Sequence, residues 1–565
     1  MYFLDDLKQK IKVALNLEKA NFSYPPETTL GDLSLAVFEL ASQEKKSPAI
    51  LATELATRLS QDLSLKEYFQ TVKAVGPYLN FFLQPEYLAT ALINEVKNAK
   101  DSYGQNTNGQ NQRVMIEYSN GNTHKEYHVG HLRNISYGDA INRLLTANGY
   151  AAIPVSYIND FGIHVAKTLW EWQNNPEFQA SSENRGYLLG KCYVAATQAL
   201  EKEPEKKEVV GQIMKEIESR QGASYELWQK TRAWSIKYFA QIYKELGVKF
   251  THIFYENEMI DAGLKLVEEL KEKKVLVKSE GAIIADLDQF GLGVLPIIRS
   301  DGTALYPVGD LALALTKFQQ YGLDESIYVV DVRQSLYFKQ LFKILELMGD
   351  TRLRLQLAYD FVTLPEGMMS SRTGNVITYE ELKEKIQEKL SQETKKRHLD
   401  WTKSRIAMVA DSLTASTIKF ELLKVSAEKI ITFNIEEALK FDGYTACYLQ
   451  YGYARLKSII RKEAWAWSKP PVDLKVLKEP KERELLMKVA KYPEIIALAG
   501  QKFNPSEVTR YLFELTQLFN DYYHEINILK AEPALRHARL ALIKAIAQVL
   551  ANGFKVLGLK ILEEM

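Results

Sequence analysis

The stretch from residue 114 to residue 158 constrains the fold most, because strand-like and helix-like patterns alternate along it. A short apolar run at 114–116 is followed by a polar loop and then by apolar residues that repeat every three to four positions. Asn148-Gly149 ends this helical pattern, and a second apolar run follows at 151–158. Two strands joined by a helix in this way run parallel, so we expect an α/β, Rossmann-like parallel sheet.

The pattern of apolar and charged residues changes after this unit. Residues 165–275 are mainly helical and charged, as is typical of an insertion, and apolar runs return at 281–287, 294–298 and 327–332. From about residue 402 onward the apolar period is helical to the end, apart from a proline-rich surface loop at 468–471. We therefore expect an all-α C-terminal domain.

The first hundred residues combine helical spacing with one extended run. Leu33, Val37 and Leu40 fall at helical intervals, whereas 78–83 is predicted to be extended. A polar stretch rich in glycine and asparagine at 101–112 indicates a linker. The predicted domains are an α+β unit at 1–108, a parallel-sheet unit at 109–400 with its insertion at about 165–275, and an all-helical unit at 401–565.

The charge balance excludes a chain that is basic all over. Lys and Arg number 72, Asp and Glu 71, and the net charge is +1, so any nucleic-acid binding must use a local basic face. Residues 534–565 offer one candidate face, with five Lys or Arg against two Glu.

Cysteine content and hydropathy indicate the compartment. Cys192 and Cys447 are too few for a disulfide framework or a thiolate zinc site, which favours a reducing setting. The N-terminal segment has acids where a signal peptide needs an apolar core, and no uninterrupted apolar run approaches the roughly eighteen residues of a membrane span. We expect a cytoplasmic protein without a membrane partner.

The first segment suited to chemistry is His128-Val129-Gly130-His131, in the loop between the first strand and its helix. Loops at the carboxyl ends of parallel strands, beside helix N-termini, are where α/β sheets bind phosphates. Gly130 allows a flat ring or a phosphate to approach the backbone. Taken alone, the motif fits a helix cap, a structural hydrogen bond or a metal site at least as well.

The second segment, at 368–375, is a small, hydroxyl-rich loop with one cation, of sequence Met368-Met369-Ser370-Ser371-Arg372-Thr373-Gly374-Asn375. Its hydroxyls, its backbone N–H groups and the Arg372 guanidinium are suited to folding over a polyphosphate. Taken alone, this segment fits a surface turn before a helix better than a phosphate loop.

Together and in this order, the two segments resemble the two signatures of class I aminoacyl-tRNA synthetases, and their surroundings resemble the arginyl-tRNA synthetase family. The matching stretches are 117–131 (EYSNGNTHKEYHVGH), 159–162 (NDFG), 301–312 (DGTALYPVGDLA) and 334–342. The terminal domains also look like that family's tRNA-contacting N-terminal domain and helical anticodon-binding domain, through 31–36 (GDLSLA), 76–81 (GPYLNF), 448–455 (YLQYGYAR) and 538–544 (ARLALIK).

The resemblance implies an arginine–tRNA ligase. Such an enzyme activates L-arginine with ATP to arginyl-adenylate, releasing pyrophosphate, and transfers arginine to the 3′ end of tRNA(Arg), the activation depending on tRNA. Mg²⁺ is expected with ATP, held by phosphate oxygens and water, so no protein metal site is implied. The implied catalytic residues are Lys125, His128, His131, Ser370, Ser371 and Arg372, and the implied ATP-binding residues are His128, Gly130, His131, Met369 and Ser370.

The resemblance also implies an arginine pocket formed by Glu117, Asn122, Tyr306, Asp310 and Gln334. A guanidinium group carries five donors and no acceptor, so the carboxylates of Glu117 and Asp310 are suitable in type. Asp310 equally fits a cap for the helix that follows it.

The chain departs from the family pattern at four positions. Met368 and Thr373 stand where lysines are frequent, which removes positive charge near the leaving group. Lys125 resembles an upstream lysine that serves in members without the loop lysines, and we prefer that role to a solvated loop lysine. The other two departures are His164, where glutamine is usual, and Tyr337, where histidine is usual.

For tRNA, the resemblance implies contacts at the anticodon through Tyr448, Tyr451, Arg455, Tyr523, Arg539 and Met565. Aromatic rings stack on unpaired bases and arginines bind phosphates. Tyrosines at helical spacing are more often part of a core.

Two competing hypotheses stay open on the sequence alone. A related nucleotidyl-transferring enzyme would keep the HVGH loop without using tRNA, and both terminal domains argue against it. A non-catalytic RNA-binding relative would explain the altered second signature, and the retention of both histidines, Lys125, Tyr306 and Asp310 argues against that. We expect a monomer whose partners are tRNA(Arg), arginine and ATP, and neither DNA nor a membrane.

Overall fold

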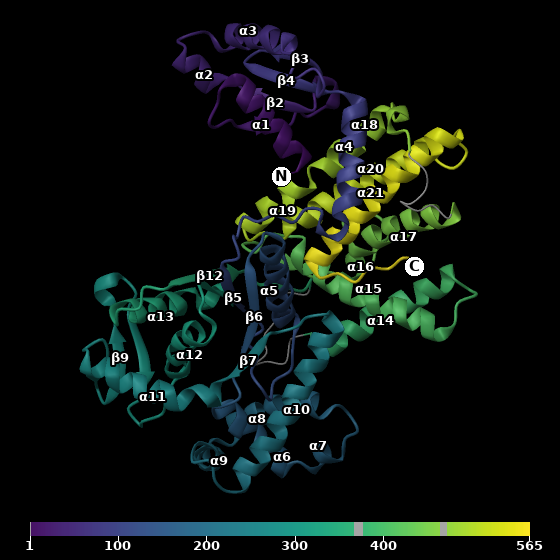
Figure 1. The fold of residues 1–565 in the computed structure, drawn as a ribbon. Helices are drawn as coiled ribbons and strands as arrows, with labels where there is room; N and C mark the ends of the chain where they lie inside the picture. The colour runs from purple at the N-terminus through teal and green to yellow at the C-terminus, as the bar shows by residue number, and fades with distance from the viewer. Residues whose placement is uncertain (1, 366–376, 464–471) are drawn as a thin grey trace.

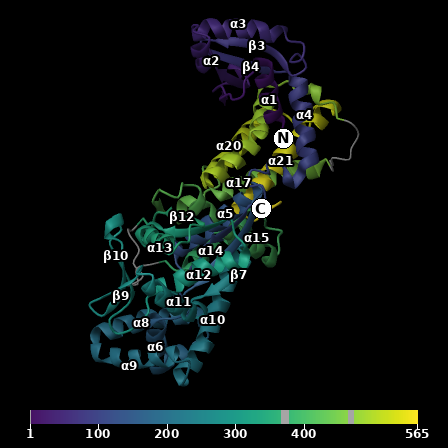
Figure 2. The same ribbon diagram turned by 60° about the vertical axis from the view of Figure 1, so that its left-hand side comes forward.

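The computed structural model describes residues 2–365, 377–463 and 472–565, so the loop at 468–471 lies outside the described residues. The chain forms an elongated body in which the N-terminal unit projects at one end and the helical insertion lies at the other (Figures 1 and 2). The parallel sheet lies between them, beside the helical C-terminal unit (Figure 1).

The N-terminal unit is an α+β fold whose four strands are antiparallel in the order β1-β2-β4-β3. Its elements are α1 (Phe3–Leu15), β1 (Phe22–Ser23), β2 (Leu33–Ala36), α2 (Phe38–Gln43), α3 (Pro48–Gln61), β3 (Phe69–Val75), β4 (Tyr78–Leu83) and α4 (Pro85–Ala99). The helical spacing read at Leu33 was wrong, because β2 begins there and pairs with β4. Leu33, Leu35 and Val37 also alternate at period two, and all three are buried.

The central sheet has five parallel strands in the order β12-β11-β5-β6-β7, which confirms the predicted βαβ unit. These strands are β5 (Arg113–Glu117), β6 (Ala151–Ile158), β7 (His252–Tyr255), β11 (Glu325–Asp331) and β12 (Leu353–Tyr359). Ile116 packs in the cluster that contains α5 (Val129–Ala147), whereas Met115 packs with Leu313 of α12 (Tyr306–Tyr321). Alternate residues of β5 therefore face opposite layers, and helices cover both faces of the sheet.

Within the stretch 165–275, an uninterrupted series of helices runs as far as residue 246, where α10 ends. Its helices are α6 (Ile163–Asn174), α7 (Pro176–Ala180), α8 (Arg185–Lys202), α9 (Lys207–Glu218) and α10 (Ala223–Leu246). The chain then returns to the sheet as edge strand β7 and continues into α11 (Glu256–Glu272). A separate antiparallel sheet follows, made of β8 (Val277–Ser279), β9 (Ala282–Asp286) and β10 (Val294–Ile298), which accounts for the first two of the three apolar runs.

The C-terminal unit is helical apart from the short strand β14, which pairs with β13. From α13 onward the elements are α13 (Ser335–Leu347), β13 (Val362–Thr363), α14 (Tyr379–Arg397), α15 (Lys403–Leu423), β14 (Ile431–Thr432), α16 (Ile435–Ala438), α17 (Ala446–Lys462), α18 (Pro480–Ala490), α19 (Tyr492–Gln501), α20 (Ser506–Glu525) and α21 (Pro533–Leu557). Short 3₁₀ turns occur at Thr28–Leu30, Lys100–Ser102, Pro204–Lys206, Asp288–Phe290, Val332–Gln334 and Leu474–Val476.

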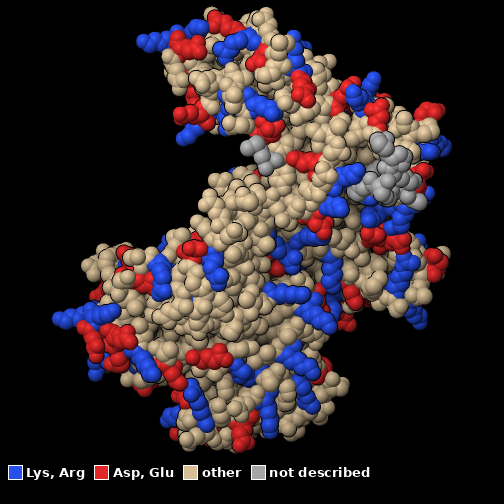
Figure 3. All heavy atoms as spheres, in the orientation of Figure 1, with Lys and Arg blue, Asp and Glu red and all other residues tan. Residues whose placement is uncertain are grey.

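Helix α21 is the core helix of this unit. It is long and apolar enough to cross a membrane, but 78% of its most apolar stretch is buried inside the protein. Two of the five cations counted toward a basic face over residues 534–565 are paired with carboxylates, since buried Arg539 pairs with Glu482 and exposed Lys555 pairs with Asp101. Lys and Arg side chains gather over α14 and α15 on the face shown in Figure 3.

Residues 101–112, expected to be a linker, contain a segment that packs against the C-terminal unit. Tyr103 is buried, and its hydroxyl donates to the carbonyl oxygen of Val489 (3.1 Å). The side-chain amide of Asn552 donates to the carbonyl oxygen of Tyr103 (3.0 Å). The turn-forming residues of this stretch therefore form a connection that is fixed against the C-terminal unit at Tyr103.

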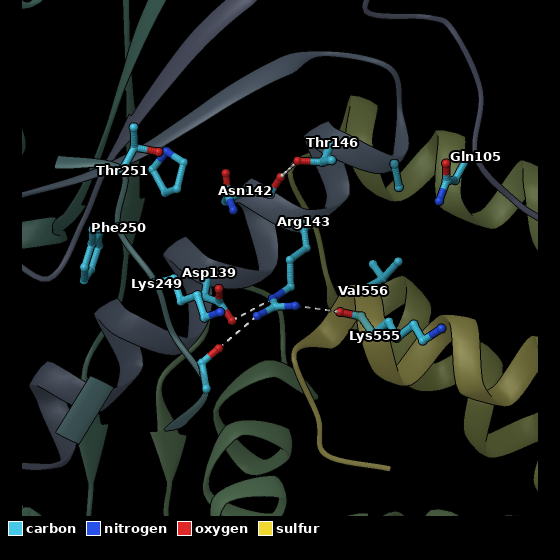
Figure 4. A pocket seen from close by; sticks show the side chains of 13 residues that line it. Gln105, Asp139, Asn142, Arg143, Thr146, Lys249, Phe250, Thr251, Lys555 and Val556 are labelled. Carbon is cyan, nitrogen blue, oxygen red and sulfur yellow. Dashed lines mark hydrogen bonds and ion pairs between the residues drawn. The ribbon is translucent and has the colours of Figure 1, made fainter. Parts of the chain in front are cut away.

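Helix α5 is joined to the end of α21 by a group of charges beside a cleft of about 550 Å³ (Figure 4). Asp139 of α5 accepts hydrogen bonds from Arg143 (2.9 Å) and from Lys419 of α15 (2.7 Å). Arg143 also donates to the carbonyl oxygen of Lys555 (3.3 Å), and Lys419 to that of Gly558 (3.1 Å). These cations satisfy carbonyl groups at the end of α21 and tie the sheet to the C-terminal unit.

We expect Asp139→Asn to destabilise the protein by about 3 kcal/mol, because it leaves the buried Lys419 ammonium without a counter-charge. The two side chains are only 3% and 1% exposed. Urea unfolding of the two proteins measures the difference. The matched control is Asp101→Asn, which removes an exposed pair with Lys555 of α21 and should cost less than about 1 kcal/mol. Equal losses in the two variants would contradict the structural role of Asp139.

Candidate active site

The first signature forms the N-terminus of α5, at the carboxyl side of the parallel sheet. His128 is the N-cap residue, and its Nδ1 accepts a hydrogen bond from the backbone N–H of Gly130 (3.1 Å). Nδ1 of His131 accepts one from the backbone N–H of His128 (3.2 Å), and the two ring centroids lie 3.9 Å apart. The motif is therefore a helix cap, as one interpretation of the sequence proposed, but capping uses only one nitrogen of each ring.

Capping also determines where the protons of these two rings are. A ring nitrogen that accepts from a backbone N–H carries no proton, so each neutral ring is protonated at Nε2. Burial lowers the pKa of His128 to about 4 and that of His131 well below its usual value, and the charge of Lys125 adds to both shifts. At neutral pH the pair therefore offers two uncharged Nε2–H donors and no positive charge.

Lys125 lies in the loop that leads to these histidines. Its ammonium group is 4.6 Å from the centroid of the Tyr193 ring on α8. Among the residues that the structure describes, Lys125 forms no ion pair with a carboxylate. Its charge, which acts on both signature histidines, is therefore available to an anionic group next to them.

The chain that follows the second signature lies directly beside the first. The backbone N–H of Tyr379 donates to the carbonyl oxygen of Tyr127 (2.8 Å), and His128 forms an antiparallel bridge with Thr378. The two segments thus meet where the described chain resumes, at residue 377. The signature-loop residues Met368, Met369, Ser370, Ser371, Arg372 and Thr373 lie outside the described residues.

Arg333 is a further cation near His128, which the sequence analysis did not select. It lies in the turn after β11 and forms a bidentate ion pair with Asp331 (2.8 Å for each bond). After burial, its charge is the largest contribution to the lowered pKa of His128. The available signal was an arginine just past the carboxyl end of a parallel strand, in the sequence VVDVRQ at 329–334.

Asp310 lies inside α12 and does not cap it, because the helix already begins at Tyr306. The cap interpretation of Asp310 was therefore wrong. The hydroxyl group of Tyr337, on α13, donates a hydrogen bond to the Asp310 carboxylate. Burial raises the pKa of Asp310 to about 7, although the bond from Tyr337 acts in the opposite direction.

Glu256, the first residue of α11, is a second buried carboxyl group, and sequence reasoning missed it. It is 5% exposed, and its Oε2 has no hydrogen-bond partner among the described residues. Burial raises its pKa to about 8, with a contribution from the negative charge of Asp310. The signal in the sequence was its position directly after β7, which corresponds to that of Glu117 at the end of β5.

Other polar groups lie close to these carboxyls. The Tyr157 hydroxyl is buried without a partner in the described part of the chain, and a Cβ atom at Gly309 would lie 2.6 Å from it and 3.8 Å from Glu256. His164 is also buried with no partner for its Nε2 among the same residues, but the charges that act on it include those of Lys125 and His124, so it lies on the side of the signature loop. Carboxyls and unsatisfied polar atoms gathered in this way indicate a site for a cation with several donors.

The remaining residues predicted for the arginine pocket are placed differently. Glu117 is buried and forms an ion pair with Lys317, while its other oxygen accepts from the Asn120 amide (2.8 Å). Its charge is therefore neutralised inside the protein. Asn122 lies in the loop that bridges to the end of β6, and Gln334 is exposed in the turn after β11.

Four of the residues predicted to contact tRNA form one cluster on α17 and α20, which we call the tyrosine–arginine cluster: Tyr448, Tyr451, Arg455 and Tyr523. The Arg455 guanidinium lies 4.8 Å from the Tyr451 ring and 5.1 Å from the Tyr523 ring. Asn520 accepts from Arg455 and donates to the Tyr448 hydroxyl, both at 2.9 Å. Tyr523 is 39% exposed, so the cluster presents an aromatic face at the surface.

Arg539 and Met565 are not part of this cluster. Arg539 is 6% exposed, pairs with Glu482 (2.8 Å) and donates to the carbonyl oxygen of Asn527 (3.1 Å). It connects segments within the C-terminal unit, and this burial does not fit the predicted contact with tRNA. Met565 packs, partly buried, against the core.

Family models match the chain in the order of its three units. They are the arginyl tRNA synthetase N-terminal domain over 2–83, the class I (R) tRNA synthetase catalytic domain over 92–434 and the DALR anticodon-binding domain over 449–565. The arginine–tRNA ligase of Bdellovibrio bacteriovorus is 34% identical over 552 residues, which cover 96% of this chain and 93% of that protein. The chain belongs to the class I arginyl-tRNA synthetase family.

Further comparisons agree with this assignment of the synthetase. The arginine–tRNA ligase of Clostridium perfringens is 33% identical over 572 residues and 99% of each chain. The structure of Thermus thermophilus arginyl-tRNA synthetase superposes with a TM-score of 0.81 at 25% identity, over 99% of this chain and 100% of that one. The synthetase is an arginine–tRNA ligase that uses ATP and binds tRNA(Arg) through its DALR domain, so both competing hypotheses from the sequence were wrong.

Within the described residues of the synthetase, no group of three or more His, Cys, Asp or Glu side chains is arranged to hold a metal ion. Cys192 and Cys447 are buried free thiols.

We expect arginine to bind the synthetase more weakly as the pH falls from about 8 to below 7. Asp310 and Glu256 have pKa values raised to about 7 and about 8, and both lose the negative charge that attracts a guanidinium as they are protonated. The KM for arginine should rise about tenfold over this range, and that for ATP much less. Tyr337→Phe removes a hydrogen bond that lowers the pKa of Asp310, so the pH at which affinity falls should move upward. An arginine KM that does not depend on pH would contradict the pocket.

Proposed function

We propose that the synthetase activates arginine between two neutral histidine donors and a set of cations, most of which lie outside the second signature loop. One carboxylate oxygen of arginine forms a bond to the α-phosphorus of ATP as the bond to pyrophosphate breaks, and the products are arginyl-adenylate and pyrophosphate. A hydroxyl of the terminal adenosine of tRNA(Arg) then takes the arginyl group and releases AMP. Such chemistry depends on positioning and on stabilising charge.

The observation that carries this proposal is the position of both histidines at the helix mouth, beside residues 377–379. His128 and His131 each keep an Nε2–H free to donate to a phosphate oxygen, and Gly130 leaves room for its close approach. Lys125 and Arg333 supply the positive charge that the neutral rings lack.

The second signature loop completes the phosphate site in this proposal, through Met369, Ser370, Ser371 and Arg372. Mg²⁺ accompanies ATP and is held by phosphate oxygens and water, in keeping with the chemistry of this hard cation.

The arginine side chain enters between Asp310 and Glu256 in this proposal. Two carboxyls with raised pKa values are stabilised in their charged form by a guanidinium, which also brings a donor for the unpaired Oε2 of Glu256. Tyr306, Asn122 and Gln334 line the entrance, and Glu117 acts indirectly by holding Lys317.

We further propose that tRNA(Arg) is needed for the activation step, and that its anticodon meets the tyrosine–arginine cluster. In the proposed division of the chain, residues 1–108 contact the body of the tRNA, 109–400 carry out catalysis and 401–565 contact the anticodon. We place the synthetase in the cytoplasm as a monomer.

Lys125→Ala tests the phosphate site. With tRNA present, arginine-dependent ATP–pyrophosphate exchange should fall by about 10²-fold, as it does for other lost donors to a developing charge. The control is Lys237→Ala, which removes an exposed lysine of α10 that belongs to neither substrate site and should leave exchange unchanged. Exchange by Lys125→Ala at the rate of the parent would refute the role of this lysine.

Tyr523→Ala tests the anticodon site. Loss of one stacking face should weaken binding of tRNA(Arg) by about tenfold, since stacking on one base contributes about 1–3 kcal/mol. Fluorescence titration with labelled tRNA measures the change. Phe290→Ala is the matched control, because Phe290 is an aromatic residue with the same 39% exposure but lies in the turn between β9 and β10. An equal or absent effect of the two substitutions would exclude the cluster from the tRNA interface.

A further inference from the structure

His124 precedes Lys125 in the signature loop and is held in place by the helical insertion. It is fully buried, and its backbone is left-handed, with φ at +62°. Its Nε2 lies 2.8 Å from the Thr231 hydroxyl of α10, its Nδ1 lies 2.9 Å from the Thr123 hydroxyl, and its backbone N–H donates to Ser235 (3.0 Å). A loop residue with this number of buried contacts is fixed in one orientation.

The direction of the bond to Thr231 follows from the helix. The Thr231 hydroxyl has a single proton, and it donates to carbonyl oxygens of its own helix, those of Leu227 (3.0 Å) and Trp228 (3.2 Å). Its oxygen is therefore left to accept, and Nε2 of His124 carries the proton that it accepts. Burial lowers the pKa of His124 to about 3, so the ring is neutral and uses one nitrogen as a donor and the other as an acceptor.

The left-handed backbone at His124 is unfavourable for a residue with a Cβ atom, so the surrounding contacts must hold it. It turns the chain between buried Thr123 and partly exposed Lys125. Lys125 then extends toward Tyr193 of α8, close enough to the signature histidines for its charge to act on both. The insertion thus contacts this loop on two helices, at α10 through the ring of His124 and at α8 through the lysine itself.

We propose that His124 is a positioning residue for Lys125: its hydrogen bond to Thr231 fixes the loop so that the Lys125 ammonium reaches the ATP phosphates. The proposal rests on the proposed role of Lys125 in activation. A merely structural His124 would stabilise the fold without acting through that lysine.

The test is a double-mutant cycle in the full-length enzyme, with arginine-dependent ATP–pyrophosphate exchange measured in the presence of tRNA. Thr231→Val keeps the shape of the residue and removes the acceptor for His124. It should lower the kcat of exchange about tenfold, since a small displacement of a charged group is costly in a site of this kind, and leave the KM for arginine within about twofold. In the Lys125→Ala background the same substitution should have no further effect.

Thr516→Val is the matched control. Thr516 is also fully buried in a helix and donates to a carbonyl of its own helix (2.8 Å), but it lies on α20, far from the signature loop. It should leave the kcat unchanged. His124→Asn is the conservative variant, because asparagine tolerates a left-handed backbone and keeps an amide donor, and it should retain more activity than His124→Leu.

The outcomes separate the two proposals. Equal losses from Thr231→Val in the parent and in Lys125→Ala would overturn the positioning role of His124. No loss from Lys125→Ala alone would overturn the proposed role of the lysine. Thermal unfolding of every variant identifies one that does not fold, and if Thr231→Val is such a case, His124→Asn takes its place in the same cycle with the same criterion.

Discussion

The rest of the structure depends on the burial of helix α5 between the parallel sheet and the helical C-terminal unit. The N-terminus of α5 carries the two signature histidines, and its middle lies so close to the end of β5 that a Cβ atom at Gly138 would lie 2.2 Å from the Tyr118 ring. Its second half holds Asp139 and Arg143, which bind α15 and the end of α21. The helix that presents the histidines is therefore held in place by the domain that binds tRNA.

In the absence of substrates, the candidate site holds charged groups whose opposite charges would come from arginine and ATP. Burial leaves His128 and His131 uncharged, so the positive charge beside them comes from other residues, of which Lys125 and Arg333 are within the described part of the chain. Burial also raises the pKa values of Asp310 and Glu256. In the proposed function, a guanidinium group stabilises the charged form of these carboxyls and the cations stabilise the phosphates, so that each half of the site is complementary to one of the two substrates.

The parallel sheet, the helical C-terminal unit and the position of the first signature could be predicted from the sequence, because each depends on local periodicity. The strand at Leu33 could not, since Leu33, Leu35 and Val37 fit both a helical and an alternating period and only pairing with β4 decides between them. The burial of α21 was also missed. A count of its Lys and Arg residues does not show which of them pair with carboxylates from other segments, as Arg539 does with Glu482. The candidate site shows the same division. Glu256 and Arg333 lie far from the signatures in the sequence. They come near the candidate site because β7 and β11 are parallel, so that the carboxyl ends of both strands lie on the same side of the sheet.

A crystal structure of the enzyme with tRNA(Arg), arginine and a non-hydrolysable ATP analogue tests the account most directly. We predict that Nε2 of His128, Nε2 of His131 and Nζ of Lys125 each lie within hydrogen-bonding distance of a phosphate oxygen, with the guanidinium of arginine between Asp310 and Glu256. Phosphates bound away from all three groups, or a guanidinium bound by neither carboxylate, would contradict it.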